Sequence, residues 1–197
     1  MWETLVEYDR ELFRFLNGLF IGEYDAFWIF VTAIENWIPL YLLFFYFLLR
    51  AYKLKPAILS IVGVFSVAAA TLGLTNLVKN QIARLRPNNE PVLMDSIRIY
   101  QTPENFSFWS GHSAVSFAVA TFVAFILVSS RARPHHKPSA IESKWLLLIF
   151  IWPVTFALSR IMVGVHYPFD VIVGMVVGVL LGYAFAKAYL FLVYKTK

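Results

Sequence analysis

No charged residue occurs in the stretch Ala57–Val78, which has the sequence AILSIVGVFSVAAATLGLTNLV. A helix that crosses the hydrocarbon core of a bilayer needs about 20 predominantly apolar residues, and this stretch is long enough. Pro56 lies directly before it, where proline favours the first turn of a helix. The stretch therefore predicts a transmembrane helix.

Four further apolar stretches indicate that the chain crosses the membrane repeatedly: Ala26–Leu49, Ser113–Ser130, Trp145–Ser159 and Val171–Ala186. The last of these continues past Lys187 into a second apolar patch that ends at Tyr194. The first spans only if Glu35 is tolerated, and Pro39 predicts a kink or a break within it. We therefore expect an all-α fold, a polytopic transmembrane helix bundle with five spans.

The N-terminal region has a different pattern. Apolar residues recur there at helical spacing, at Leu5, Tyr8, Leu12, Phe15, Leu16 and Leu19, with charged residues between them. This pattern predicts an amphipathic helix that lies in the interface or against the bundle and does not span alone. Glu3, Glu7 and Asp9 occupy the region where a signal peptide needs positive charge, so we expect no signal peptide.

Composition supports a membrane protein of one domain, residues 1–197. Charged residues make up 15% of the chain and hydrophobic residues 59%, whereas a soluble domain has about 25% charged residues. The net charge is +5, and much of the basic excess lies in short loops beside apolar stretches. Membrane topology explains that placement, so we do not expect nucleic-acid binding.

Metal-ligating patterns are missing from the sequence. Cysteine is absent, which excludes a thiolate metal site. His135 and His136 are adjacent, and they belong to a basic loop that we expect to be solvated. We expect no cofactor, no bound metal and no obligate protein partner.

The loops predict how the chain is oriented. If the spans alternate, the basic segments Arg50–Lys55, Arg131–Lys137 and Lys195–Lys197 fall on one side, which should be cytoplasmic. The opposite side then contains the connections Gln81–Gly111 and Arg160–Asp170. The first of these also contains arginines, which the topology rule does not explain.

Two cations on that outer side suggest an anion clamp. Lys79 and Arg86 are seven residues apart, so in a helix they project from nearly the same face, whereas Arg84 points elsewhere. Pro87 should end that helix just after Arg86. Such a pair suits phosphate oxygens, although basic residues at a membrane surface are more often anchors that reach toward the headgroups.

A second group lies at a predicted helix start, in the segment Ser107–His112. The backbone N–H groups of a first helical turn have no helical partner, and the helix dipole adds positive charge there, so this is a suitable cradle for an anion. His112 could give a proton to a leaving group. Ser110 could equally be only the N-cap of the helix.

The third group contains Ser159-Arg160, His166 and Asp170. The helix face of Asp170 continues through a glycine stripe at Gly174, Gly178 and Gly182, which should pack against neighbouring helices and turn Asp170 inward. An inward carboxylate near the membrane could hold His166 in one tautomer, or it could serve as a helix N-cap, and both roles can hold together.

With these three groups of residues, the chain resembles the type 2 phosphatidic acid phosphatase family, in its membrane lipid phosphatase branch. The three family motifs match, in order, Lys79 with Arg86-Pro87, Ser110-Gly111-His112, and Ser159-Arg160 with His166 and Asp170. One position departs, because Trp109 stands where the family has proline. That tryptophan could weaken the cradle or act as an interfacial anchor. The family pattern implies six membrane helices, which requires either counting the N-terminal helix or breaking the Ala26–Leu49 stretch near Pro39.

The resemblance also implies roles for these residues. His166 would attack phosphorus to form a phosphohistidine, Asp170 would orient it, and His112 would protonate the leaving lipid oxygen and then activate water. The phosphate oxygens would be held by Lys79, Arg86, Arg160, Ser110 and the Gly111 backbone N–H. The expected enzyme is a metal-independent lipid phosphatase of the bacterial plasma membrane, with its site on the extracytoplasmic side.

Several substrates and two rival functions remain open at this point. The family's bacterial members, phosphatidylglycerophosphatase B and undecaprenyl pyrophosphate phosphatase, suggest phosphatidylglycerol phosphate or undecaprenyl pyrophosphate, and phosphatidic acid is a third candidate. A transporter or binding protein for a phosphorylated lipid would need the cations but not the two histidines. A structural membrane subunit is favoured only by the glycine stripe.

Overall fold

The computed structural model describes residues 2–19, 22–131 and 143–195, and these residues form helices and connecting segments without a strand. The α-helices are α1 (Trp2–Asn17), α2 (Asp25–Thr32), α3 (Ile38–Ala51), α4 (Leu54–Ile82), α5 (Gly111–Arg131), α6 (Ile151–Met162) and α7 (Pro168–Lys195). Short 3-10 helices are η1 (Ile34–Trp37), η2 (Pro87–Asn89), η3 (Met94–Ser96) and η4 (Ser143–Phe150). The predicted all-α fold is confirmed.

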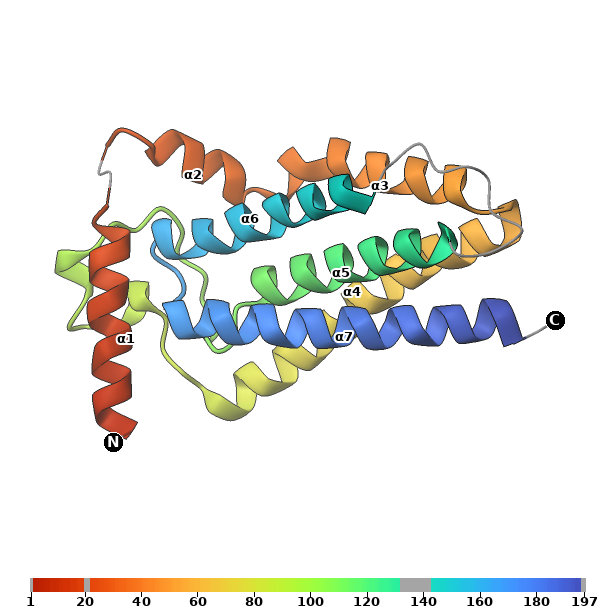
Figure 1. Cartoon of the computed structure of the whole chain (residues 1–197). Helices are drawn as coiled ribbons and strands as arrows, with labels where there is room; N and C mark the ends of the chain where they lie inside the picture. Colours follow the sequence, from red (N-terminus) through yellow and green to blue (C-terminus); the bar gives the residue numbers. More distant parts are fainter. Residues whose placement is uncertain (1, 20–21, 132–142, 196–197) are drawn as a thin grey trace.

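The long helices form one bundle whose axes run in a common direction (Figure 1). Within the described residues, four helical stretches are long and apolar enough to cross a membrane: Ile34–Ala51, Leu54–Asn89, Gly111–Ser129 and Pro168–Tyr194. A shorter apolar helix, Leu147–Met162, lies beside them. This is the architecture of a multi-pass membrane protein.

The stretch Ala26–Leu49 is not a single helix. It breaks between α2 and α3, where η1 intervenes and Pro39 lies in the first turn of α3. Two side chains satisfy backbone carbonyls at the break: Trp37 Nε1 donates to Val31 O at 2.7 Å, and Asn36 Nδ2 donates to Phe30 O at 2.7 Å. The predicted break near Pro39 is therefore present, but α2 has only eight residues and is not long enough to span, so the expected six membrane helices stay a prediction.

Helices α5 and α7 pack closely because of the glycine stripe. An added Cβ at Gly174, Gly178 or Gly182 would lie 2.3–2.6 Å from a backbone carbonyl oxygen of α5 or of Ser110 just before it. Only glycine permits this approach between the two helix backbones. The predicted stripe is thus an intramolecular packing surface, and it brings the N-terminal ends of α5 and α7 together.

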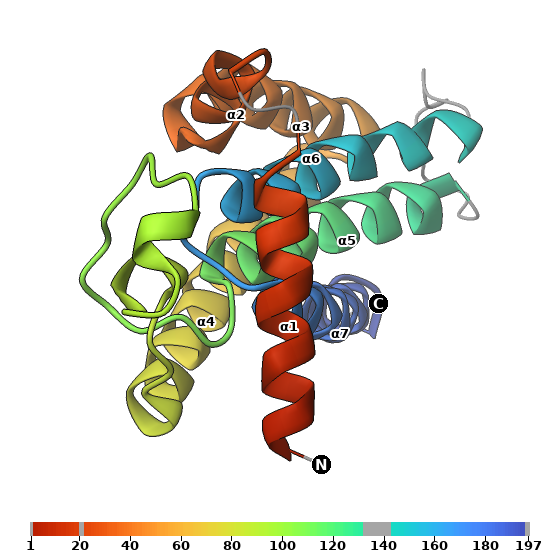
Figure 2. The ribbon, with the colours of Figure 1, turned by 90° about the vertical axis from the view of Figure 1, so that its left-hand side faces the viewer.

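Helix α1 crosses the end of the bundle, at a large angle to the other helices, in both views (Figures 1 and 2). Its buried face contains Asp9, Phe13 and Asn17, each at most 1% exposed. Asn17 Nδ2 donates to the backbone oxygens of Ile161 and Met162 at 3.0 and 3.2 Å, which fixes α1 to the end of α6. The amphipathic helix is confirmed and lies against the bundle.

The two ends of the bundle differ as the loop pattern predicts. The α3–α4 turn and the C-terminal ends of α5 and α7 lie at one end, and residues 83–110 and the α6–α7 connection lie at the other, with α1 (Figure 1). Most of the basic loop Arg131–Lys137, including His135 and His136, lies outside the described residues, as do residues 196–197.

Candidate active site

Lys79 and Arg86 meet at the end of α4, but not by sharing a helix face. The helix ends at Ile82, and Ala83 has a left-handed backbone with φ of 50°. The prediction that Pro87 ends the helix was therefore wrong, and Arg86 lies in extended chain beyond it. Lys79 Nζ donates to the backbone oxygen of Phe106 at 2.6 Å, so the lysine points toward the 83–110 segment.

Arg86 is fixed by Asn105 and by the α6–α7 connection. Its Nε donates to the Asn105 backbone oxygen and its Nη2 to Asn105 Oδ1, both at 2.7 Å. Its Nη1 donates to the Val165 backbone oxygen at 2.9 Å and lies 3.0 Å from His166 Nε2. The arginine is 4% exposed, so these contacts satisfy a buried guanidinium.

His166 lies between α6 and α7, and the contact with Arg86 determines its tautomer. Arginine only donates hydrogen bonds, so His166 Nε2 must be the ring nitrogen with the lone pair. The proton then belongs on Nδ1, which lies 3.4 Å from Asp170 Oδ2. The result is an imidazole with its lone pair on Nε2, the form that the nucleophile role implied by the resemblance requires, and that role stays a prediction.

Asp170 stands behind His166 and is fully buried at the start of α7. Its Oδ2 accepts the Tyr167 backbone N–H at 3.0 Å and the Ser107 hydroxyl, and its Oδ1 accepts Arg84 Nη1 at 2.8 Å. The carboxylate thus accepts a backbone N–H at the first turn of α7 and also faces His166 Nδ1 at 3.4 Å, while its role in orienting His166 stays a prediction.

The N-terminus of α5 supplies the next part of the site. Ser110 is completely buried, and its hydroxyl accepts the Ser113 backbone N–H at 3.3 Å and contacts Ser113 Oγ at 2.9 Å. It is thus the N-cap of α5, and its predicted contact with phosphate stays a prediction. Gly111 and His112 line the adjoining cavity, and the His112 ring lies 5.2 Å from the Phe156 ring, between centroids.

Arg160 approaches from α6 and is 3% exposed. Its Nη1 donates to Thr32 Oγ1 at the end of α2 and to Gln101 Oε1 at 2.9 Å. Its Nε is buried and has no hydrogen-bond partner in the part of the chain that the structure describes. A buried N–H without a partner is unfavourable, so this arginine has donor capacity left for a ligand.

Trp109 does not anchor the chain at a lipid interface, and that alternative was wrong. The side chain is 9% exposed, and its Nε1 donates to Thr75 Oγ1 on α4 at 2.8 Å. The tryptophan therefore links the segment before α5 to α4 where the family pattern has proline.

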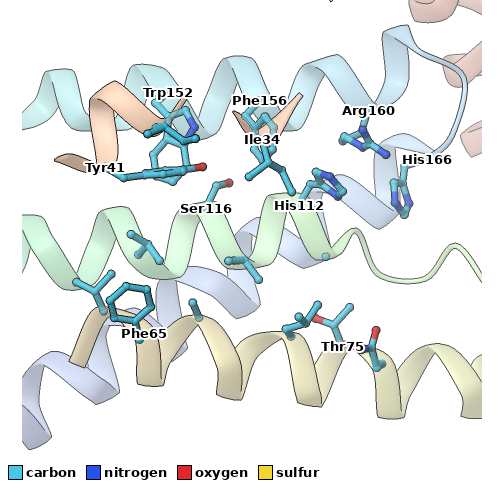
Figure 3. Close-up of a pocket in the computed structure, with 18 of the residues that line it drawn as sticks. Ile34, Tyr41, Phe65, Thr75, His112, Ser116, Trp152, Phe156, Arg160 and His166 are labelled. Carbon is cyan, nitrogen blue, oxygen red and sulfur yellow. The ribbon is translucent and has the colours of Figure 1, made fainter. Parts of the chain in front are cut away.

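Six of the predicted residues line one cavity of about 680 Å³: Lys79, Arg86, Gly111, His112, Arg160 and His166. Figure 3 shows His112, Arg160 and His166 gathered at one end of it, with Tyr41, Phe65 and Trp152 at the other. Asp170 and Ser110 are not among the lining residues and lie behind the wall. The cavity therefore joins a polar end to a long apolar part.

The electrostatics of the polar end favour an uncharged nucleophile. Burial, followed by the positive charges of Arg86, Lys79, Arg160 and Arg84, holds the pKa of His166 well below its usual value. A neutral imidazole keeps an unprotonated Nε2, which here accepts from Arg86 Nη1. The same cations make this end of the cavity suited to an anion.

Sequence reasoning missed two residues that shape the site. Asn105 holds Arg86 through its side chain and its backbone, and no spacing in the sequence indicates that contact. Arg84 was expected to point away, yet it forms ion pairs with Asp170 at 2.8 Å and with Asp9 at 2.7 Å. Because the helix ends at Ile82, helical spacing could not place Arg84 correctly.

Comparison with known proteins shows the family of this chain. The family model described as PAP2 superfamily matches residues 59–194. Lipid A 4'-phosphatase from Bacteroides thetaiotaomicron is 28% identical over 190 residues, which cover 94% of this chain and 78% of that protein. Lipid A 4'-phosphatase from Porphyromonas gingivalis is 30% identical over 193 residues, covering 96% and 76%.

A solved structure has the same fold. The transmembrane PAP2-type phosphatidylglycerolphosphate phosphatase from Bacillus subtilis superposes with a TM-score of 0.70 at 20% identity, covering 94% of this chain and 86% of that one. The matched family model covers all three motifs, from Lys79 to Asp170. The chain therefore belongs to the PAP2 superfamily and is a membrane lipid phosphatase.

Proposed function

We propose that the protein removes a terminal phosphate from a lipid through a phosphohistidine on His166. The observation that supports this most is the convergence of two histidines and three cations at one end of a cavity, with Asp170 behind His166. In the first step the Nε2 lone pair forms a bond to phosphorus while the bond from phosphorus to the lipid oxygen breaks. His112, in its protonated form, gives its proton to that oxygen.

The second step reverses these roles. Water attacks the phosphorus of the phosphohistidine, and the now neutral His112 takes the proton from that water. The P–N bond breaks, its electron pair returns to Nε2, and inorganic phosphate leaves. Asp170 keeps the His166 proton on Nδ1 in both steps and balances the positive charge that develops on the ring.

The cations stabilise the charge on the transferred phosphoryl group. Phosphoryl transfer depends mostly on positioning and on electrostatic stabilisation, and Lys79, Arg86 and Arg160 supply both without a metal ion. Each is fixed by a hydrogen bond to a carbonyl or side-chain oxygen: Phe106 O, Asn105 Oδ1 and Gln101 Oε1. The free Nε–H of Arg160 and the Gly111 N–H at the start of α5 add donors.

The apolar part of the cavity fits a lipid chain. It is lined by apolar side chains of α3, α4, α5 and α6, and several of these are exposed on the outer surface of the bundle, including Ile38, Leu42, Phe65 and Leu72. A cavity whose apolar rim faces the bilayer admits an anchored substrate from the side. The phosphate would then reach the cations while the chain stays among apolar residues.

An acylated glucosamine phosphate of the lipid A type is the substrate class we favour. The support is similarity over nearly the whole chain to two proteins named lipid A 4'-phosphatase. This lipid was not among the three candidates that the motifs suggested. Phosphatidylglycerol phosphate, undecaprenyl pyrophosphate and phosphatidic acid remain the alternatives, since each presents a terminal phosphate on an apolar anchor.

The basic loops support a site on the extracytoplasmic side of a bacterial plasma membrane. Arg50 at the end of α3, Lys53 in the α3–α4 turn and Lys55 at the start of α4 lie at the end of the bundle opposite the site. By the tendency of basic loops to remain in the cytoplasm, the site then faces outward. Cysteine labelling of the two ends in intact and permeabilised cells tests this orientation, since a site end that labels only after permeabilisation contradicts it.

Phosphate release by the purified, detergent-solubilised protein tests the reaction and its substrate. The assay compares lipid A, phosphatidylglycerol phosphate, undecaprenyl pyrophosphate and phosphatidic acid at equal concentrations, with EDTA present. We expect release from lipid A at the highest kcat/KM, with no loss in EDTA. A higher kcat/KM for another lipid replaces the substrate assignment, and loss in EDTA that zinc or magnesium restores contradicts metal independence.

His166→Ala separates this enzyme from a lipid transporter. An enzyme that depends on the phosphohistidine loses phosphate release, whereas binding of inorganic phosphate to the cations remains. A transporter that holds its ligand with the same cations keeps most of its flux in the variant. Phosphate release by His166→Ala at the parent rate therefore contradicts the proposed mechanism.

A further inference from the structure

Arg84 connects the catalytic carboxylate to the N-terminal helix. Its Nη1 donates to Asp170 Oδ1 at 2.8 Å, and its Nη2 donates to Asp9 Oδ2 at 2.7 Å. The guanidinium carbon lies 3.8 Å from the centre of the Tyr167 ring. Tyr167 is the residue that follows His166 in the chain. Arg84 is not among the residues that line the cavity, so it does not reach the substrate.

The partner on α1 is as buried as the catalytic carboxylate. Asp9 is 1% exposed, and its second oxygen, Oδ1, accepts the Phe169 backbone N–H in the first turn of α7 at 2.9 Å. Burial raises the pKa of Asp9, while the Phe169 N–H and Arg84 act in the opposite direction. A buried carboxylate is tolerated when it is paired, and Arg84 provides the pairing for both acids.

The two oxygen atoms of Asp170 have different partners, and this difference fixes which oxygen faces His166. Arg84 occupies Oδ1, so Oδ2 is the oxygen that faces His166 Nδ1, together with the Ser107 hydroxyl and the Tyr167 N–H. A carboxylate that lost the Oδ1 contact could rotate, and the proton on His166 Nδ1 would lose its fixed acceptor. The orientation of the imidazole depends on that acceptor.

We infer that Arg84 is a positioning residue for the His166–Asp170 pair and that Asp9 holds it in place, which makes α1 part of the catalytic apparatus. This inference rests on the proposed role of His166 as nucleophile. It adds two residues outside the three motifs. Asp9 lies in α1, and Arg84 is one of the residues between Lys79 and Arg86 that the first motif leaves unspecified.

The variants Arg84→Gln, Arg84→Lys and Asp9→Asn test it in the full-length enzyme. We expect Arg84→Gln to lower kcat about 100-fold with KM nearly unchanged, because the substrate-binding cations remain while the nucleophile is misaligned. Arg84→Lys keeps the charge and should recover about a tenth of the parent kcat or more. Asp9→Asn retains the acceptor for Phe169 N–H and should lower kcat about 10-fold. The control Glu7→Gln removes an exposed carboxylate of α1 and should leave kcat unchanged.

Inhibition by two anions separates positioning from general damage. Inorganic phosphate needs only the cations, whereas vanadate forms a five-coordinate adduct that also needs an aligned His166 Nε2. We expect the Ki for vanadate to rise in Arg84→Gln by a factor similar to the loss in kcat, while the Ki for phosphate stays within about threefold of the parent value.

Two results would overturn the inference: a kcat of Arg84→Gln within threefold of the parent, or a Ki for phosphate that rises as much as kcat falls. If Arg84→Gln does not fold, kcat and the Ki for phosphate are compared between Asp9→Asn and the control Glu7→Gln, and the same two results overturn the inference. The His166→Ala variant tests the proposed function separately. Activity in His166→Ala contradicts the nucleophile assignment, whereas an inactive His166→Ala beside a fully active Arg84→Gln contradicts only the role of Arg84.

Discussion

The polar and apolar parts of the cavity are held together by different forces. At the polar end, Lys79, Arg86 and Arg160 each donate to oxygen atoms of the segment 101–106, so hydrogen bonds fix their positions. In the apolar part, aromatic rings pack edge to face, such as Tyr41 against Trp152 with centroids 5.4 Å apart. Hydrogen bonds are directional, whereas apolar contacts depend mainly on area and shape.

This difference predicts two kinds of response to mutation. Changes at the polar end should alter kcat steeply, because the transition state needs charges at fixed places. Changes in the apolar part should alter KM, and only for substrates long enough to reach the changed residue. Changes at the α5–α7 contact, which lies behind the cavity wall, should lower stability.

The largest effect should come from Arg86→Gln. The substitution removes the charge beside His166 Nε2 that we propose to hold the phosphate, and we expect kcat to fall about 10²- to 10³-fold. Steady-state kinetics with the preferred lipid phosphate measures this loss. Arg50→Gln, in the last turn of α3 at the opposite end of the bundle, serves as the control. An Arg86→Gln enzyme within threefold of the parent would show that the polar end does not depend on fixed charge.

The pH dependence of kcat/KM should depend on the cations that surround His166. Because burial and the neighbouring cations lower the pKa of this residue, its imidazole stays neutral at pH values where an ordinary histidine is protonated. The acid limb of kcat/KM should therefore lie below about pH 6.5, the usual pKa of histidine. In Arg86→Gln one of the lowering charges is gone, so the limb should move to higher pH. A limb that stays in place or moves to lower pH contradicts the assignment.

The helix contact behind the site should be sensitive to a single methyl group. In Gly178→Ala the new Cβ would lie 2.3 Å from the Ala114 backbone oxygen, so α5 and α7 must separate. We expect a loss of about 1–3 kcal/mol in the free energy of unfolding, seen as a lower Tm in detergent. Gly73→Ala on α4 is the matched control, because its added Cβ meets no other part of the described chain within 4 Å beyond the adjoining turns of its own helix. Equal Tm values for the two variants would contradict the close-packing account.

The smallest effect should come from the apolar part. Ala68 lines the cavity, and Ala68→Trp should raise KM for a long-chain lipid phosphate about tenfold, equivalent to about 1.4 kcal/mol. A short-chain phosphate ester should keep its KM, because it does not reach this depth. Ala69→Trp places the same ring at an exposed neighbouring position and should change neither value. A rise in KM for both substrates in Ala68→Trp would show that this region is not a chain-binding surface.

The sequence predicted the helices and the members of the site better than their connections. Charge-free length predicts a span because a bilayer imposes that length on any chain. Glycine spacing predicted a packed face on the last helix, because one helix face repeats regularly, but it did not identify α5 as the partner. The left-handed end of α4 at Ala83 has no such regularity. Helical spacing therefore misplaced Arg86, and it also hid the ion pairs of Arg84.

Contacts between distant segments were beyond sequence reasoning for a related reason. Asn105 and Asp9 reach the site through the path of residues 83–110 and through the docking of α1. Neither path follows a period that a single sequence reveals. Motifs identified the groups that would act on phosphate, while the residues that position those groups became visible only in three dimensions.

The location of the phosphoryl group during turnover tests the central claim most directly. The experiment mixes the enzyme with its lipid phosphate, quenches within one turnover and maps the modified residue by mass spectrometry under conditions that preserve phosphohistidine. His112→Ala lacks both the proposed acid for the leaving lipid oxygen and the proposed base for water, so formation and hydrolysis of the intermediate should both slow. We predict a phosphoryl group on His166 in the parent enzyme and a slower appearance of that group in His112→Ala. A phosphoryl group on another residue, or single-turnover phosphate release by His166→Ala at the parent rate, would contradict the account.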